Sequence, residues 1–573
     1  MNKKYVLVLI LIIGAVFRFY NPTWDLGYHL HPDERFLTMV GNAMKLPNSV
    51  FAYFNPALST FNPANVGFTF FVYGDLPLII NKLFALVLNN DSYVSFTIQG
   101  RLLSGFADLL IVLLIYKTVL LFEKRYELDP SVKYWASFLY AIAVLPIQLS
   151  HFFAVDTFLN LFLFASFYCI LRYYYRKNVW DVGLGGIAFG CALASKVSAV
   201  FMLPLILTIL FFSAIPVIEV FHPVHLFRHL WSRNGLRNIV VVFFVKISLL
   251  LLIFIGACYG TVRITYPYLF EHPSFLDPRI NTLFLENIRI LKTYDNPEAW
   301  FPPSVQWLHK TPLLFSLTNL VLFGIGIPYF ILLLNGFFYI VTKHKRSIFI
   351  IIALWMVAFF LYQSTQFIKV MRYFIFLYPF YAIIAAFGLQ QLLRSRLKKY
   401  NIVLMLLLMI WPVMFFSIYV QANSRIAASQ WIYQHVPSGS LLLSEYWDDP
   451  LPLQIVPNYG KQFNGQQLPV FDPDTQEKWQ KMNSLLQQGD YLILSSNRGW
   501  GSMPTVPERY PLMTRYYQNL FLGNTSYRKV AEFTSYPSLK YLGIPIQFSD
   551  DFADESFTVY DHPKVLIFKK IKL

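Results

Sequence analysis

The chain has 573 residues, of which 56% are hydrophobic and only 14% are charged. A soluble protein of this length would carry about 25% charged residues, and several apolar runs are long enough to cross ~30 Å of hydrocarbon. The net charge of +16 lies in short clusters between these runs, a pattern that encodes membrane topology. We therefore expect a polytopic α-helical membrane protein that contacts the lipid bilayer and binds no nucleic acid.

About eleven spanning helices are predicted, and basic residues cluster in every second connection between them. Because positive charge is retained in the cytoplasm, the N-terminus is expected to be cytoplasmic and the C-terminus extracytoplasmic, in an inner or plasma membrane. The predicted spans are 5–20, 98–122, 134–151, 155–174, 180–196, 199–217, 239–260, 313–340, 347–365, 370–392 and 401–420.

Three long connections are expected on the outer face: 21–97, 261–312 and everything after residue 420. Within the first, 70–88 is apolar but carries Asp75, Pro77, Asn81 and Lys82. Counting it as a twelfth span would place the later basic clusters outside, so we predict a helix on or dipping into the outer surface. Residues 32–45 are predicted to form a short amphipathic helix that begins at a proline.

The C-terminal segment is predicted to be a soluble extracytoplasmic domain, residues 421–573, that follows a transmembrane module, residues 1–420. Strand-like runs at 441–444, 491–494 and 564–568 alternate with helical patterns at 476–488 and 508–521. This alternation indicates a small α/β or α+β domain.

Asp33 and Glu34 are adjacent carboxylates in the first outer loop, a few residues beyond the first helix. Neighbouring carboxylates repel, so at least one is expected to have a raised pKa unless a cation intervenes. A carboxylate of this kind can act as a general base. The same residues could equally begin a surface helix, and the local sequence favours neither interpretation.

Further charged residues are expected on the same face. Arg101, Ser104 and Asp108 form one stripe of the second span, and we interpret the deeper Asp108 as an interhelical ion-pair partner. Other outer connections contribute one acidic, one imidazole and three basic side chains. These are His151, Asp156, Lys196, Lys369 and Arg372.

Basic residues on the outer face run against the positive-inside rule, and an anionic ligand at the membrane surface would explain them. Arg and Lys bind phosphate well. Carboxylates beside phosphate-binding cations suit transfer of a group from a lipid phosphate to an acceptor hydroxyl. The carboxylate would remove the hydroxyl proton, and the cations would stabilise the departing lipid phosphate.

The layout resembles the GT-C superfamily of polyprenyl-phosphate-sugar-dependent glycosyltransferases. It is most similar to the family of protein O-mannosyltransferases and lipid A aminoarabinose transferases, glycosyltransferase family 39. The matching features are Asp33-Glu34, the opening Gly100-Arg-Leu-Leu-Ser104, Asp156 after paired helices, Ala194-Ser-Lys-Val-Ser-Ala199 before Leu203-Pro204, and Arg372-Tyr373 before Leu377-Tyr-Pro379.

This resemblance implies that Asp33 is the catalytic base, with Glu34 beside it, and that Asp156 contacts the acceptor or the sugar. It implies that Lys196 and Arg372 contact the donor phosphate and that transfer inverts the anomeric carbon. Arg101 and His151 join these candidate substrate-binding residues. The partners would be a polyprenyl-phosphate sugar as co-substrate and a lipid, glycan or protein acceptor.

Two alternatives remain open at this stage. A transporter or flippase for an anionic lipid or glycan would also use outer cations and an intramembrane Asp108, although the two halves of the chain lack the matching broken helices of many transporters. A divalent metal could bind His29, His31, Asp33 and Glu34, but their spacing matches no recognised ligand pattern. We expect no metal and no firmly implied cofactor.

Overall fold

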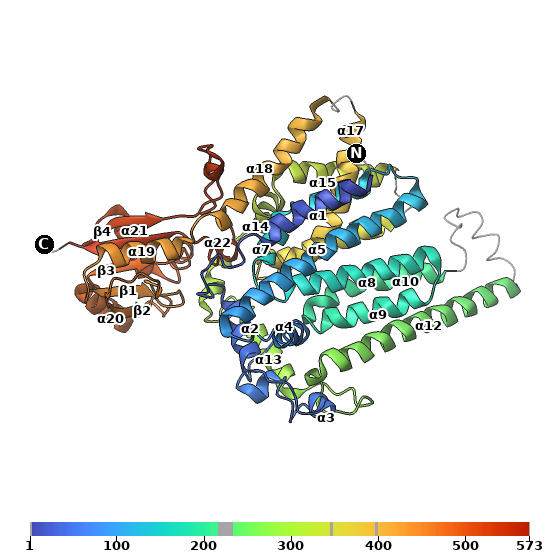
Figure 1. Cartoon of the computed structure of the whole chain (residues 1–573), viewed down its shortest axis with the longest axis horizontal. Helices are drawn as coiled ribbons and strands as arrows, with labels where there is room; N and C mark the ends of the chain where they lie inside the picture. Colours follow the sequence, from blue (N-terminus) through green and yellow to red (C-terminus); the bar gives the residue numbers. More distant parts are fainter. Residues whose placement is uncertain (1–2, 216–232, 344–347, 396–398, 572–573) are drawn as a thin grey trace.

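The computed structural model describes residues 3–215, 233–343, 348–395 and 399–571. Long helices run side by side in one bundle, and a small sheet domain lies beyond one end of it (Figure 1). The bundle helices are α1 (Lys3–Phe19), α5 (Tyr93–Tyr126), α6 (Val132–Ala141), α7 (Val144–Ser150), α8 (Asp156–Arg176), α9 (Trp180–Leu193), α10 (Leu203–Ala214), α12 (Arg233–Thr265), α14 (Leu314–Asn319), α15 (Ile327–Lys343), α16 (Ile348–Thr365), α17 (Tyr378–Arg394) and α18 (Asn401–Val420).

The expected count of eleven spans is not confirmed. By length and composition, seven helical segments of the described chain can cross a membrane, or nine if each of two bent pairs is one span. The pairs are α6 with α7, bent by 54°, and 314–325 with α15, bent by 112°. The two remaining predicted spans correspond to α1 and α9, of 17 and 14 residues. At ~1.5 Å per residue both are shorter than ~30 Å of hydrocarbon.

A buried ion pair ties α1 to α5 inside the bundle. Arg18 Nε lies 2.7 Å from Asp108 Oδ2, and both side chains are fully buried. Tyr140 on α6 donates a hydrogen bond of 2.5 Å to the other carboxylate oxygen. The interpretation of Asp108 as an ion-pair partner is confirmed. A charge at this depth is stable only when it is paired in this way.

The first outer loop contains α2 (Pro32–Ala43), α3 (Val50–Phe54), η1 (Pro63–Val66) and α4 (Leu76–Val87). The predicted helix after residue 31 is confirmed as α2: Pro32 occupies the first turn, and the His31 side chain caps the helix by accepting a hydrogen bond from Glu34 N at 3.3 Å. Helix α4 has 12 residues, about 18 Å. It is too short to span, in agreement with the expected surface helix.

The second outer loop contains η3 (Pro267–Leu269), α13 (Thr282–Thr293) and η4 (Pro302–Trp307). Short helices also lead into three bundle helices: η2 (Val197–Met202), the π-helical η5 (Leu320–Ile325) and η6 (Met371–Leu377).

The C-terminal domain is built on a five-stranded mixed sheet of order β2-β1-β3-β5-β4. β1 is parallel to β2 and β3, and β5 is antiparallel to β3 and β4. The strands are β1 (Leu441–Glu445), β2 (Asn464–Leu468), β3 (Tyr491–Leu494), β4 (Tyr527–Phe533) and β5 (Val565–Lys570), and the helices are α19 (Ser424–His435), α20 (Gln476–Gln488), α21 (Pro511–Leu522) and α22 (Glu555–Thr558). Residues of α20 and α21 share one apolar core with the sheet, and α19 belongs to a second core.

The three strands predicted from sequence correspond to β1, β3 and β5. The edge strands β2 and β4 were not predicted, because they are mostly exposed and lack a continuous apolar run.

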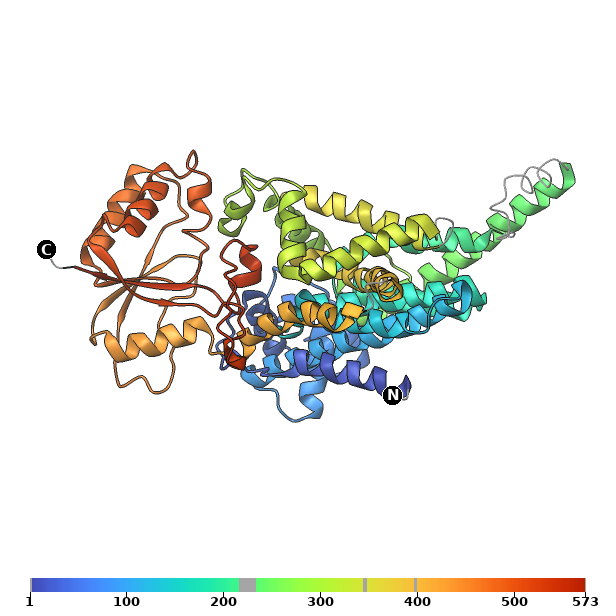
Figure 2. The same ribbon diagram turned by 90° about the horizontal axis from the view of Figure 1, so that it is seen from above.

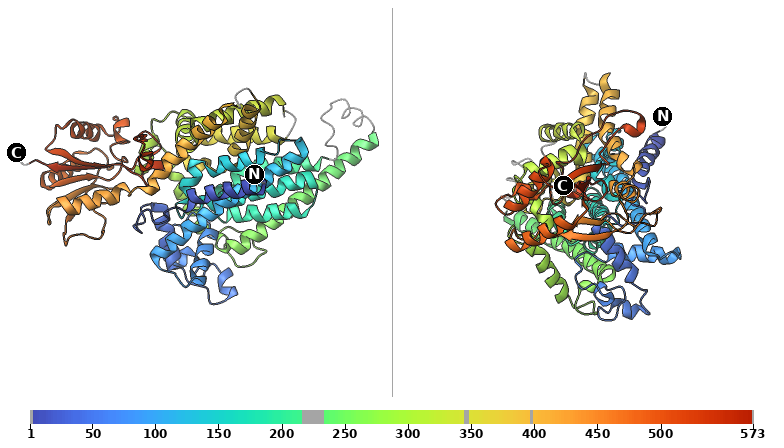
Figure 3. Two further views of the ribbon diagram at one scale, coloured as in Figure 1. Left: turned by 45° about the horizontal axis from the view of Figure 1, so that its top comes forward. Right: turned by 90° about the vertical axis from the view of Figure 1, so that its left-hand side faces the viewer.

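A segment around α22 joins the sheet domain to the bundle, and it lies between the two in Figure 2. Asp554 Oδ2 accepts a hydrogen bond of 2.8 Å from Met371 N, and Gln148 Nε2 donates one of 2.7 Å to Phe557 O. Tyr419 on α18 donates a hydrogen bond of 2.9 Å to Asp561. Viewed along the bundle, the sheet domain stands in front of this end (Figure 3).

Candidate active site

Four charged side chains from separate elements form two adjacent ion pairs at the bundle end that faces the sheet domain. Asp33 on α2 pairs with Arg372 on η6, with 2.5 Å between Oδ2 and Nη1. Asp156, the first residue of α8, pairs with Lys196, which precedes η2, with 2.8 Å between Oδ1 and Nζ. Lys196 also acts electrostatically on Asp33, and Asp156 acts on Arg372, so the four charges form one cluster.

Three of these side chains remain partly accessible. The exposed fractions are 23% for Asp33, 19% for Arg372 and 18% for Lys196, whereas Asp156 is 3% exposed. An ion or a polar group of a ligand could therefore reach the first three. Asp156 itself is nearly inaccessible to solvent.

The turn that carries Lys196 is held by a close backbone approach. Gly74 N donates a hydrogen bond to Ser195 O, and Leu76 N donates one to Ala194 O, both at 3.0 Å. A Cβ at Gly74 would lie 2.0 Å from Ala194 O, a distance that no side chain tolerates. Glycine at position 74 therefore allows the first outer loop to fix the position of Lys196.

Asp33 is held in its ionised form. Partial loss of solvent raises the pKa of this carboxyl, but the Arg372 guanidinium, with smaller effects of His31 and Lys196, brings it well below its ordinary value. Burial lowers the pKa of the neighbouring His31 to about 4, so this imidazole is neutral at pH 7. Its ring lies between Phe152 and Tyr560, with centroid distances of 4.5 and 4.2 Å.

Glu34 occupies a different environment although it is adjacent in sequence. It is fully buried, it accepts a hydrogen bond of 2.9 Å from Arg101 Nε, and it accepts another of 2.6 Å from Phe153 N. Burial raises the pKa of Glu34 above its ordinary value, and Arg101 opposes this shift. The sequence predicted one raised pKa from repulsion between the two carboxylates, whereas the raised pKa of Glu34 comes first from its burial, with a further contribution from Asp25.

Arg101 is bound on several sides by protein groups. Its Nη atoms donate hydrogen bonds of 2.9 and 2.7 Å to Asp25 and one of 2.7 Å to Pro22 O. Its guanidinium also lies 4.9 Å from the centre of a Trp24 ring. In this arrangement Arg101 connects α5 to the start of the first outer loop and holds Glu34.

His151 is likewise packed into the protein. Its ring stacks on Tyr419 at 3.5 Å, and its two nitrogens face Ile147 O at 2.9 Å and Tyr20 O at 3.1 Å. The structure thus separates the predicted site residues into two groups. One group, Asp33, Asp156, Lys196 and Arg372, forms the charged cluster. The other group, Glu34, Arg101 and His151, is buried and hydrogen-bonded to other parts of the protein.

Aromatic side chains complete the cluster, and the sequence singled out only one of them. Lys196 Nζ lies 5.3 Å from the ring centre of Tyr373, next to Arg372 in sequence. Tyr73 lies within the electrostatic reach of Asp33, Arg372 and Asp156. Tyr560 comes from the C-terminal domain, and no local pattern could have predicted its contact with a residue of the first loop.

Arg372 retains unused hydrogen-bonding capacity. Its buried Nε has no hydrogen-bond partner among the described residues. A buried N–H without a partner is unfavourable, and an anionic ligand beside Arg372 would satisfy it. Over the same described ranges, no three His, Cys, Asp or Glu side chains converge on a point that could hold a metal ion.

Comparison with known proteins gives a match over part of the chain. The family model described as dolichyl-phosphate-mannose-protein mannosyltransferase matches residues 80–258, which include Arg101, Asp156 and Lys196. No match was found among curated proteins.

Solved structures with a similar fold cover nearly the whole chain. The oligosaccharyltransferase of Archaeoglobus fulgidus, in its apo form, is 14% identical, aligns with 99% of this chain and 88% of its own, and has a TM-score of 0.50. ArnT of Cupriavidus metallidurans bound to undecaprenyl phosphate is 11% identical, covers 99% and 98%, and has a TM-score of 0.45. At such identities a likeness concerns the fold. The partial family match and the fold shared with the apo oligosaccharyltransferase agree with the resemblance seen in the sequence.

Proposed function

We propose that this protein moves a sugar from a polyprenyl-phosphate-linked donor to an acceptor hydroxyl on the extracytoplasmic face, with Asp33 as the general base. The observation that carries the proposal is the pairing of an accessible carboxylate, Asp33, with Arg372 beside a second cation, Lys196. General-base removal of a proton and stabilisation of a leaving phosphate are the two requirements of this reaction.

The donor phosphate would bind between Arg372 and Lys196. Arg372 offers a planar fork of donors and Lys196 a point charge, which are the usual ways in which these residues hold phosphate. The phosphate would satisfy the unpartnered Nε of Arg372 and would compete with Asp33 and Asp156 for the two cations.

Transfer would then proceed as a single displacement. The acceptor oxygen forms a bond to the anomeric carbon while the bond from that carbon to the phosphate oxygen breaks. Asp33 accepts the hydroxyl proton, and the electron pair of the broken bond leaves with the polyprenyl phosphate. Attack opposite the leaving group inverts the anomeric carbon and needs no covalent enzyme intermediate.

The low pKa of Asp33 is compatible with this role. The carboxylate must be ionised before it can accept a proton, and Arg372 keeps it so. When a bound phosphate shares the charge of Arg372, the guanidinium stabilises the Asp33 anion less. The pKa of Asp33 then rises toward the range in which a carboxylate is an effective base.

The class of donor is supported by the family match, because the name of that family specifies dolichyl-phosphate-mannose, a polyprenyl-phosphate sugar. The outer face is supported by the alternation of basic clusters along the sequence. A transporter is less well supported, since the intramembrane Asp108 already has Arg18 as its partner.

The deciding experiment is to incubate the purified protein with a panel of polyprenyl-phosphate sugars and measure the release of polyprenyl phosphate. We expect release from one donor, accelerated by the correct acceptor. Movement of intact donor across proteoliposomes without release from any donor would instead identify a transporter.

A further inference from the structure

A cavity of about 1050 Å³ lies at the bundle end opposite Asp33. It is lined by the final turns of α5 and α8 and by parts of α10 and α16. Along α16 it extends from Ile348 to Ala358, about 15 Å at the rise of an α-helix. The cavity is therefore an elongated groove that begins at the end of the bundle and runs into its apolar part.

The mouth of the groove is strongly basic. Lys124 and Arg125 close α5, while Arg176 and Lys177 close α8. Among the described residues that line the groove there are these four cations and no Asp or Glu. Lys177 donates a hydrogen bond of 3.2 Å to Ser213 O, and this contact leaves its charge uncompensated.

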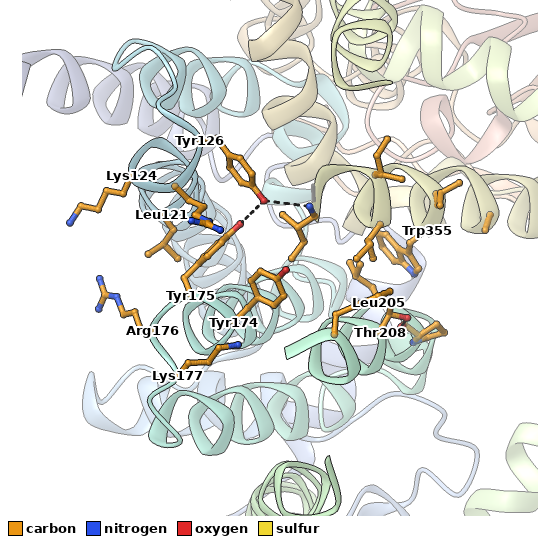
Figure 4. Close-up of a pocket in the computed structure, with 18 residues that line it drawn as sticks. Leu121, Lys124, Tyr126, Tyr174, Tyr175, Arg176, Lys177, Leu205, Thr208 and Trp355 are labelled. Atoms are coloured by element: carbon orange, nitrogen blue, oxygen red, sulfur yellow. Dashed lines mark hydrogen bonds between the residues drawn. The ribbon is translucent and has the colours of Figure 1, made fainter. Parts of the chain in front are cut away.

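The interior of the groove is apolar, with a belt of tyrosines between the two regions. Tyr175 donates a hydrogen bond of 3.3 Å to Tyr126, which holds the ends of α5 and α8 together. In Figure 4 Lys124, Arg176 and Lys177 lie on one side of these rings, and Leu205 and Trp355 lie on the other. The groove thus changes from basic to aromatic to aliphatic. Membrane proteins show the same order of side chains from the lipid headgroups to the hydrocarbon core.

Basic residues at this end of the bundle have a simpler explanation, namely that they set membrane topology. Lys343 and Lys399 are examples, since both lie at helix ends on the same side and neither lines this groove. Four cations around the mouth of a groove of this size are a different arrangement. Basic pockets between transmembrane helices are a recognised form of site for anionic lipid headgroups.

We propose that this groove binds an anionic phospholipid from the leaflet opposite the candidate active site. The phosphate would lie among Lys124, Arg125, Arg176 and Lys177, and an acyl chain would follow the apolar wall past Leu205 and Leu354. The site is separate from the cluster around Asp33, and the inference does not depend on the proposed reaction.

Native mass spectrometry of the purified full-length chain tests the headgroup. The protein is mixed with phosphatidylglycerol or with phosphatidylcholine that carries the same acyl chains. We expect phosphatidylglycerol to be retained at least tenfold more, and Arg125→Gln/Arg176→Gln to remove most of this preference. The matched variant Lys343→Gln/Lys399→Gln, which loses the same charge outside the groove, should keep it. Equal loss in both double variants would overturn the proposal.

A second arm tests the acyl chain. Leu354 is 65% exposed, so Leu354→Trp should fold normally while it narrows the groove and leaves all four cations in place. We expect this variant to lose retained phosphatidylglycerol about tenfold. If inorganic phosphate at millimolar concentration displaces the lipid equally from the parent and from Leu354→Trp, or if Leu354→Trp retains the lipid fully, the groove is an anion site and not a lipid site.

Discussion

Asp33 and Glu34 are adjacent in sequence, but their carboxylates lie in different environments. On α2 their side chains point to different neighbours: Asp33 meets Arg372 at the partly accessible cluster, and Glu34 meets Arg101 in the protein interior. The pKa of the first is lowered and that of the second is raised. The Arg372 guanidinium lowers the pKa of Asp33, and burial is the largest cause of the raised pKa of Glu34.

The proposed base is tested by Asp33→Asn, which keeps the size of the side chain and removes its proton-accepting oxygen anion. We expect the turnover number to fall by roughly 10²–10⁴, the usual contribution of a general base. Polyprenyl phosphate release measures it. Asp277→Asn, at an exposed ion pair of the outer loop, is the matched control and should stay near the parent rate. Near-normal turnover by Asp33→Asn would remove the base assignment.

The phosphate role of Arg372 is tested by two substitutions. Arg372→Gln removes the charge, and we expect the KM for the donor to rise about 10- to 100-fold, the equivalent of a hydrogen bond to a charged group. Arg372→Lys keeps the charge but loses the fork, so a smaller rise is expected. Arg279→Gln on the exposed outer loop is the control. An unchanged donor KM in both Arg372 variants contradicts a phosphate contact.

Because the pKa of the buried His562 is raised, we expect the stability of the folded chain to depend on pH. The imidazole is buried between Asp550 and Asp561, at 2.9 and 2.5 Å. Burial lowers its pKa, but the two carboxylates raise it to about 10, above the ordinary value of 6.5. The protonated ring therefore stabilises the folded state fully below pH 6.5, and this contribution is lost as the pH rises from 6.5 toward 10.

Thermal unfolding of the full chain in detergent measures this effect. We expect the midpoint temperature to fall between pH 6.5 and 10, and we expect His562→Gln to lower the midpoint at pH 6.5 and to flatten this dependence. His435→Gln, an exposed histidine at the end of α19, should behave like the parent. If the parent and His562→Gln have the same pH slope, His562 does not carry the charge.

At the scale of elements, a chain of ion pairs connects α2 to α19 through the loop after β1. Asp449 accepts hydrogen bonds from Arg35 on α2 at 2.9 Å and from Arg425 on α19 at 3.3 Å. Arg425 also pairs with Asp448 at 2.7 Å. The sheet domain is thereby attached to the helix that carries Asp33.

The two arginines in this chain should contribute very differently. Arg425 is buried, so Arg425→Gln leaves Asp448 buried without its partner, and we expect the full chain to lose roughly 3–5 kcal/mol of stability. Arg35 is 37% exposed, so Arg35→Gln should cost about 0–1 kcal/mol. Thermal unfolding with limited proteolysis of the 446–470 region compares them. Equal effects of the two variants would contradict the ranking by burial.

At the scale of the whole molecule, the predicted orientation places the two bundle ends on opposite sides of the membrane. Leu276, in the second outer loop, is 93% exposed, and Lys399 lies exposed at the other end. In intact cells, a membrane-impermeant thiol reagent should label Leu276→Cys and not Lys399→Cys. The opposite labelling pattern would invert the topology.

Most of the secondary structure followed from local patterns. Each of the eleven predicted spans contains helix in the described residues, although only seven to nine of these helical segments are long and apolar enough to cross a membrane. Three of five strands were predicted because β1, β3 and β5 carry apolar runs. The edge strands were missed because hydrogen bonding to a neighbour, and not their own composition, makes them strands.

The sequence alone determined that this chain is a polytopic membrane protein, and it identified Asp33, Asp156, Lys196 and Arg372 as charges that need a reason. The membrane class follows from composition and from the length of the apolar runs, which are local properties. The four charges stand out because a charged side chain beside a bilayer is energetically costly unless it has a partner. Only the tertiary structure decided which charges meet. Asp33 and Arg372 meet although 339 residues separate them in the sequence. The contacts of Arg101 with Glu34 and Asp25, of His151 with Tyr419 and of Tyr560 with His31 also depend on tertiary packing, which no local sequence pattern records.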